Sequence, residues 1–142
     1  MILVMSLLML VGCAEVSPPV SQEVHSRSAT FSLPQRIEEL AGSWEYKDDV
    51  GQGIITLNAE GKGAYEWEEG RFETLSLENQ TWTGVWIQEG NDCEGGFELA
   101  FSDDSPVAQG DWWYTRIGKD KDPLQPGGTF SMARPSAIHL AE

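Results

Sequence analysis

The sequence predicts an all-β domain, an eight-stranded antiparallel sheet that forms an up-and-down barrel or a flattened sandwich, preceded by a short helical turn. From Gly42 onward, bulky and polar residues alternate with a period of two, which is typical of half-buried strands. Short clusters of Gly, Asp, Asn and Pro separate these runs, so neighbouring strands are expected to pair as hairpins. No amphipathic helix remains to cover the sheet, which must therefore fold onto itself.

The first predicted element is a short helical turn over residues 36–42. Ile37 and Leu40 lie three residues apart and share a helical face, and Gly42 is a typical helix stop. The eight strands then follow in order. They are predicted at residues 42–47, 53–58, 63–68, 71–77, 81–88, 95–102, 107–116 and 128–134.

In every predicted strand, a glycine precedes a bulky residue by two positions. The pairs are Gly42/Trp44, Gly53/Ile55, Gly63/Tyr65, Gly70/Phe72, Gly84/Trp86, Gly95/Phe97, Gly110/Trp112 and Gly128/Phe130. Residues i and i+2 share a face, so each glycine leaves room for a ring from the next strand and helps the sheet to bend. The alternative is that the glycines only mark turns. We favour packing for Gly84 and Gly110, which lie inside their strands.

The N-terminus has the pattern of an export signal. Residues 1–12 form an uncharged, mostly apolar run that is too short for a bilayer-spanning helix and fits the hydrophobic region of a signal peptide. Leu10-Val11-Gly12-Cys13 resembles the lipobox of bacterial lipoproteins. The resemblance implies a diacylglyceryl group on Cys13 and cleavage before it. Because Ala14 follows, it further implies a location in the cell envelope, on the outer membrane facing the periplasm. The alternative is an ordinary secretory signal.

The chain therefore divides into four predicted segments. They are a signal peptide at 1–12, the lipidated cysteine and a flexible Pro- and Ser-rich tether at 13–35, the β-barrel domain at 36–136 and a tail at 137–142. Once Cys13 is lipidated, Cys93 has no intramolecular disulfide partner, and the domain depends on its core alone. We interpret Cys93 as a single thiol in a loop, with a disulfide between chains as the alternative.

The net charge of −14 restricts the partners. It argues against nucleic acid, which requires basic patches, and against electrostatic adhesion to anionic lipid head groups. The membrane contact is therefore predicted to run through the lipid on Cys13. A basic protein or a small molecule stays open as a further partner.

The sequence predicts no enzyme and no cofactor. His25 and His139 lie outside the predicted strands, where no base can be held against a nucleophile. By alternation, Glu66, Glu68 and Glu73 fall on the outer, wet face rather than forming a catalytic pair. No cluster has the ligand spacing of a zinc or calcium site.

Gly42-Ser43-Trp44 resembles the Gly-x-Trp that opens the first strand in the calycins, the lipocalin and avidin group. The preceding short helix fits that family, as does Arg134 at the end of the last strand. In calycins an arginine near the chain end packs over that tryptophan. The resemblance implies a barrel in which Trp44 and Arg134 have structural roles.

Four residues are candidates for ligand or partner contact: Trp86, Trp112, Trp113 and Arg116. Adjacent strand residues face opposite sides, which places Trp112 inside and Trp113 outside. There Trp113 either contacts a protein or sugar, or is covered by the tether or tail. Arg116 is predicted on the inner face with Trp112, near the barrel mouth, where it would need an acidic partner or an anionic ligand.

The tryptophans also bear on the barrel interior. They either line a small pocket or, together with the other aromatic residues, fill the barrel, and we favour a filled interior. The set is Trp44, Trp67, Trp86 and Trp112.

Three functions follow from these features. The preferred one is a membrane-anchored envelope lipoprotein whose barrel is a binding or interaction domain. The second is a calycin-type carrier of small hydrophobic ligands, which requires a cavity of about a few hundred Å³. The third is an acidic inhibitor of a basic hydrolase such as lysozyme, with salt-sensitive binding. The sequence leaves the ligand, the partner and the oligomeric state open.

Overall fold

The computed structural model of the chain describes residues 31–135. The predicted signal peptide, Cys13, most of the tether and the tail lie outside these residues. Among the described residues, no helix is long and apolar enough to cross a membrane.

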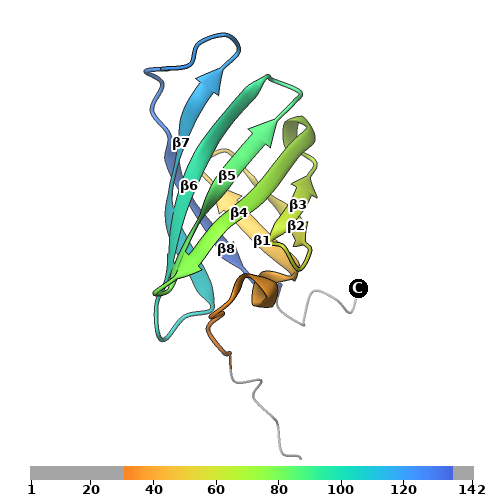
Figure 1. Ribbon diagram of the computed structural model, residues 1–142, viewed down its shortest axis with the longest axis vertical. Helices are drawn as coiled ribbons and strands as arrows, with labels where there is room; N and C mark the ends of the chain where they lie inside the picture. The colour runs from red at the N-terminus through yellow and green to blue at the C-terminus, as the bar shows by residue number, and fades with distance from the viewer. Residues whose placement is uncertain (1–30, 136–142) are drawn as a thin grey trace, which may run out of the picture. The chain divides into compact units, whose positions relative to one another are not determined.

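The described residues form a closed antiparallel barrel of eight strands (Figure 1). Each strand pairs with the next along the chain, and β8 closes the barrel by pairing with β1. The predicted up-and-down barrel is confirmed, and the sandwich alternative is wrong. The elements are the 3-10 turn η1 (Ile37–Leu40), β1 (Gly42–Asp48), β2 (Gln52–Leu57), β3 (Lys62–Tyr65), the 3-10 turn η2 (Trp67–Glu69), β4 (Gly70–Glu78), β5 (Thr81–Gln88), β6 (Cys93–Phe101), β7 (Val107–Ile117) and β8 (Gly128–Ala133).

The strand predicted at 63–68 ends early. β3 stops at Tyr65, and Trp67 lies in η2. Glu68 and Glu69 follow with φ angles of 51° and 52°, in the left-handed region that extended strands do not contain. The prediction is wrong here because Tyr65 and Trp67 keep the spacing of a strand although a turn begins between them.

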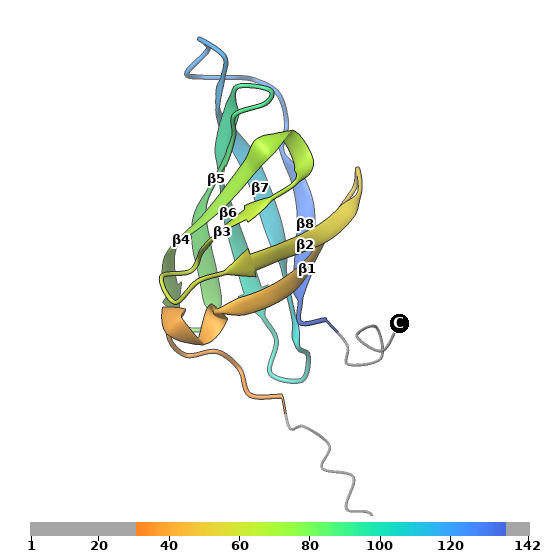
Figure 2. The same cartoon turned by 90° about the vertical axis from the view of Figure 1, so that its right-hand side faces the viewer.

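One end of the barrel is packed solid. Trp44 and Trp82 are fully buried, with ring centroids 5.2 Å apart, and the Phe101 ring stacks on Trp82 at 6.1 Å. Leu40 of η1 is also fully buried, and its carbonyl oxygen accepts a 2.7 Å hydrogen bond from Trp44 Nε1. The predicted helical turn therefore exists as η1 and closes this end of the barrel (Figure 2).

Arg134 joins η1 to β1 at this closed end. Its guanidinium carbon lies 4.1 Å from the centroid of the Trp44 ring, a cation–π contact. Its Nη2 donates to the carbonyl oxygen of Glu39 at 2.8 Å, and its Nη1 donates to that of Ser43 at 3.3 Å. Trp44 and Arg134 thus make the contact that the calycin resemblance implies.

Aromatic rings lie across glycines of the neighbouring strands. Phe97 faces Gly84 in register, and a Cβ added to Gly84 would lie 2.5 Å from the Phe97 ring, so ring packing is confirmed there. Gly110 differs, since the three atoms nearest its added Cβ would all be backbone atoms of Glu98 and Leu99, and the predicted ring packing is not found there. The other cross-strand pairs of this kind on the inner face are Tyr46/Gly53, Tyr65/Gly70, Trp86/Gly95 and Trp112/Gly128.

Packing also extends to residues outside the predicted strands. Phe31 and Leu33, in the segment predicted as tether, pack against the barrel core. Cys93 is not in a loop as predicted. It is the first residue of β6 and is buried in the core, and this burial raises the pKa of its thiol. A buried, protonated thiol is a poor partner for a disulfide between chains.

Candidate functional site

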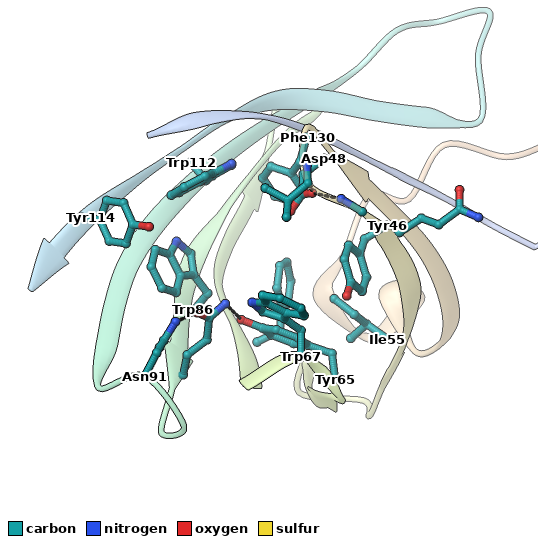
Figure 3. Close-up of a pocket in the computed structure, with 15 residues that line it drawn as sticks. Tyr46, Asp48, Ile55, Tyr65, Trp67, Trp86, Asn91, Trp112, Tyr114 and Phe130 are labelled. Carbon is teal, nitrogen blue, oxygen red and sulfur yellow. Dashed lines mark hydrogen bonds between the residues drawn. The ribbon is translucent and has the colours of Figure 1, made fainter. Parts of the chain in front are cut away.

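The other end of the barrel is hollow. A cavity of about 340 Å³ opens there, beside the β1–β2, β3–β4 and β5–β6 turns (Figure 3). Small-molecule sites usually have volumes of about 300–1,000 Å³. The preferred prediction of a filled interior is therefore right for the closed end and wrong for the open end. The lining residues are Tyr46, Asp48, Val50, Gly51, Gln52, Ile55, Tyr65, Trp67, Phe72, Trp86, Gln88, Asn91, Trp112, Tyr114 and Phe130.

The cavity exists because two strands separate toward the open end. β2 and β3 pair only through Thr56 with Ala64 and Leu57 with Gly63. Beyond these pairs, the first residues of β2 and the η2 turn after β3 lie apart and widen the mouth (Figure 2). The short β3 is thus the local cause of the hollow end.

Three aromatic side chains form one wall of the cavity. Trp86 lies 5.7 Å from Trp112 and 5.4 Å from Tyr114, and Trp112 lies 5.2 Å from Tyr114, measured between ring centroids. All three contacts are edge-to-face, an arrangement that stabilises aromatic pairs. Trp86 Nε1 donates to the carbonyl oxygen of Gly96 at 3.3 Å. The predicted contact residues Trp86 and Trp112 therefore stand together, and Tyr114 joins them.

A second wall carries the polar groups of the site. The Tyr46 and Tyr65 ring centroids are 5.8 Å apart. Gln88 Nε2 donates to Tyr65 Oη at 2.9 Å, and Asn91 Nδ2 donates to Gln88 Oε1 at 2.9 Å (Figure 3). Burial raises the pKa of Tyr65 to about 12, so its hydroxyl stays protonated at neutral pH. These side chains place a few hydrogen-bonding groups along one edge of an otherwise apolar cavity.

Trp67 stands at the mouth with 57% of its surface exposed. It is the first residue of η2, and the other two residues of this turn, Glu68 and Glu69, both have left-handed backbone angles. The turn is fixed by a 2.9 Å hydrogen bond from Gly90 N to the carbonyl oxygen of Glu68. Strained backbone of this kind is common around ligand sites. Glu69-Gly70 is a turn signal, and it could have placed the end of β3 before Trp67.

Asp48 is a site residue that the sequence analysis treated only as part of a turn. It is the last residue of β1, on the same face as Trp44 and Tyr46, and it lines the cavity. Its Oδ1 accepts 2.8 Å hydrogen bonds from the backbone N–H groups of Val50 and Gly51. Asp48 is the one charged side chain among the lining residues. Alternation continued from Trp44 would have identified it.

Arg116 is not inside the barrel, contrary to prediction. The β6–β7 register shifts between Glu94 and Gly95, so that Gly95 faces Tyr114 while Glu94 faces Arg116. This bulge moves Arg116 to the outer face, where it bonds to Asp92 at 2.8 Å and to Glu94 at 3.4 Å. Arg116 therefore finds acidic partners on the outside and does not line the cavity.

Trp113 faces outward, as predicted from its place beside Trp112. It is 43% exposed. Its ring lies over Gly96 of β6, where an added Cβ would come within 2.6 Å of the indole. Trp113 therefore covers a buried glycine on the outer face. The predicted covering by the tether or tail concerns residues that lie largely outside the described range.

The glutamates that the sequence analysis weighed as a catalytic pair lie away from the cavity. Glu66, Glu68 and Glu73 do not line the cavity. Within residues 31–135, no three His, Cys, Asp or Glu side chains are placed to hold a metal ion together.

Compared with known proteins, the chain matches no protein-family model, no curated protein sequence and no solved structure.

Proposed function

We propose that this protein is a lipid-anchored binding protein of the bacterial cell envelope, and that its barrel holds a small, mostly apolar molecule in the open-end cavity. The cavity of about 340 Å³, with its aromatic walls, is the observation that carries the proposal. This favours the small-ligand carrier among the three functions that the sequence allows.

The walls are suited to bind a ring-bearing ligand. Trp86, Trp112 and Tyr114 contact one another edge-to-face, and Trp86 and Trp112 lie across glycines of the next strand. Side chains fixed in this way lose little conformational freedom when a ligand arrives, and such preorganisation favours affinity. The amide groups of Gln88 and Asn91 are held at the cavity edge by hydrogen bonds to Tyr65 and to each other, where they are placed to orient a ligand.

The proposal is binding without catalysis. Acid–base chemistry on a sugar requires two carboxyl groups flanking the bond, and Asp48 is alone among the lining side chains in being charged. The Tyr65 hydroxyl has its pKa raised to about 12 and is a hydrogen-bonding group rather than a base near neutral pH.

The proposed anchor is compatible with an accessible cavity. Phe31 and Leu33 pack against the barrel core, and the chain enters β1 through η1 at the closed end. The described part of the chain therefore enters the barrel at the end opposite the mouth (Figure 1).

The anchor is tested by Cys13→Ser in the full chain expressed in a Gram-negative bacterium. The wild type is expected to begin at Cys13, to carry a diacylglyceryl mass and to fractionate with membranes. The variant is expected to lose the lipid and the processing that depends on it. Intact mass spectrometry of both proteins decides. A wild-type chain that retains Met1 without lipid would contradict the anchor.

Cavity binding is tested by Ile55→Trp. Ile55 is 3% exposed and lines the cavity, so a larger side chain there occupies space that a ligand needs. The full wild-type chain is expected to bind para-tert-butylphenol, and Ile55→Trp is expected to weaken binding at least about tenfold, or about 1.4 kcal/mol. Isothermal titration calorimetry, blanked against protein-free buffer and detergent, measures both.

Ile54→Trp is the matched control. Ile54 is adjacent in β2 but is 51% exposed and does not line the cavity, so this variant is expected to bind like the wild type. Circular dichroism checks that both variants fold. Equal affinity of Ile55→Trp and Ile54→Trp would show that the ligand does not enter the barrel.

A further inference from the structure

Resting on the proposed function, we infer that the cavity selects cationic ligands, specifically organic ammonium groups bound between its aromatic walls and Asp48. The shape and polarity of the cavity do not decide the charge of its ligand, whereas the charges around the mouth and the arrangement of the rings favour a cation.

The first observation is the orientation of Asp48. Its side chain follows Trp44 and Tyr46 on the inner face of β1 and is half-buried at the mouth, opposite Phe130 of β8. Oδ1 is used by the turn, accepting from Val50 and Gly51. In the described part of the chain, no hydrogen bond or ion pair engages Oδ2. One carboxylate oxygen therefore remains available to a ligand.

The second observation is the lack of a positive counterpart in the cavity lining. No Lys or Arg is among the lining residues. Lys47 is exposed on the other face of β1, and Arg116 is paired outside with Asp92 and Glu94. In the β7–β8 loop, Lys119 and Lys121 are offset by Asp120 and Asp122. An anion entering the mouth would meet Asp48 with no compensating charge.

The negative potential also reaches the tyrosines of the site. Desolvation raises the pKa of Tyr46, and the carboxylates of Asp48 and Glu66 add to this effect. The chain as a whole carries a net charge of −14. A field of this sign concentrates cations at the mouth and repels anions.

The third observation is the aromatic lining itself. Trp67, Trp86 and Trp112 contribute indole rings to one cavity, and indole is the aromatic group that binds cations best. Aromatic residues around an acidic group form the type of site that recognises quaternary ammonium ions. Such ions spread their charge over methyl groups, so moving them from water into a ring-lined cavity costs little desolvation. The rings alone would also accept a neutral ligand. The negative charge of Asp48 is what favours a cation over a neutral molecule of the same shape.

The test compares three probes of similar shape on the full chain. They are para-trimethylammoniophenol, its neutral isostere para-tert-butylphenol and the anion para-phenolsulfonate. At low salt, the cation is expected to bind at least about tenfold more tightly than the neutral probe, and the anion more weakly than both. Added salt should weaken cation binding while leaving neutral binding nearly unchanged. Titration calorimetry measures all three probes.

Asp48→Asn isolates the charge. Asparagine retains the oxygen that accepts from Val50 and Gly51, so the turn is preserved while the charge is lost. The cation preference, which is the ratio of the cation's affinity to the neutral probe's affinity, is expected to fall below about threefold. Asp49→Asn removes the same charge from the next residue, which is exposed and does not line the cavity, and should keep the preference.

The outcomes separate the two proposals. If the neutral probe binds as well as the cation, or if Asp48→Asn keeps the preference, charge selection is wrong and cavity binding stands. If the anion binds best, charge selection is likewise wrong. If no probe binds the wild type, the cavity is not a site for small ring-bearing molecules, and both proposals fail.

Discussion

Replacing Trp44 with alanine is expected to lower the free energy of unfolding by about 3–5 kcal/mol. Trp44 is fully buried, contacts Trp82 at a centroid distance of 5.2 Å and donates through Nε1 to the carbonyl oxygen of Leu40. Alanine would leave a cavity at the closed end, an unpaired carbonyl oxygen on η1 and an Arg134 guanidinium without its ring. Small domains are stable by only about 5–15 kcal/mol, so the loss is a large part of the total.

Urea denaturation followed by circular dichroism measures this loss. Trp67→Ala is the matched control because Trp67 is the same residue type but is 57% exposed, and it should cost less than about 0.5 kcal/mol. Comparable losses for the two variants would mean that the closed end is not the stabilising part of the core.

Gly95→Ala is expected to lower the free energy of unfolding by about 3 kcal/mol, although it adds only one methyl group. The new Cβ would lie 1.8 Å from the carbonyl oxygen of Trp113 and 2.5 Å from the Trp86 ring. β6 and β7 would have to separate, and Trp86 would have to leave the glycine that it covers. Because Trp86 forms a wall of the cavity, affinity for para-tert-butylphenol should fall as well.

Gly51→Ala provides the comparison. A Cβ on Gly51 would meet no atom within 4 Å, so this variant should be neutral or slightly stabilising. Equilibrium unfolding measures the stability of both variants, and titration calorimetry measures their affinity for the probe. If Gly95→Ala is as stable as Gly51→Ala, β6 and β7 yield readily at this position. The packing of the Trp86 ring would then not depend on a glycine at residue 95.

The proposed ligand site depends on the same contacts as the barrel walls. Trp86 covers Gly95, Tyr46 covers Gly53, and Tyr65 covers Gly70, so each of these rings is both a part of the wall and a surface of the cavity. Stability and binding are therefore coupled at these residues. Ile55 and Asp48 are better probes of binding alone, because their substitutions leave the ring–glycine pairs intact.

The sequence by itself determined the all-β class, the order of the eight antiparallel strands, the short turn before β1 and the inward position of Trp86 and Trp112. It left a barrel and a sandwich open, and the structure decided for the barrel. These features follow from local patterns, because side chains alternate with a period of two and hairpins join neighbours along the chain. The contact of Trp44 with Arg134 was implied by resemblance. Ring packing on Gly84 was also predictable, since i and i+2 spacing defines one face.

Only the tertiary structure decided whether the interior is full or hollow. The volume inside a barrel depends on where its strands separate. β2 and β3 pair through only two residue pairs, and the sequence of neither strand shows this. Arg116 was misplaced for a similar reason, because a one-residue bulge opposite Glu94 and Gly95 reverses the face of every later residue. Alternation from Trp44 places Asp48 on the inner face, but only the closed barrel shows that its carboxylate lies beside the aromatic walls.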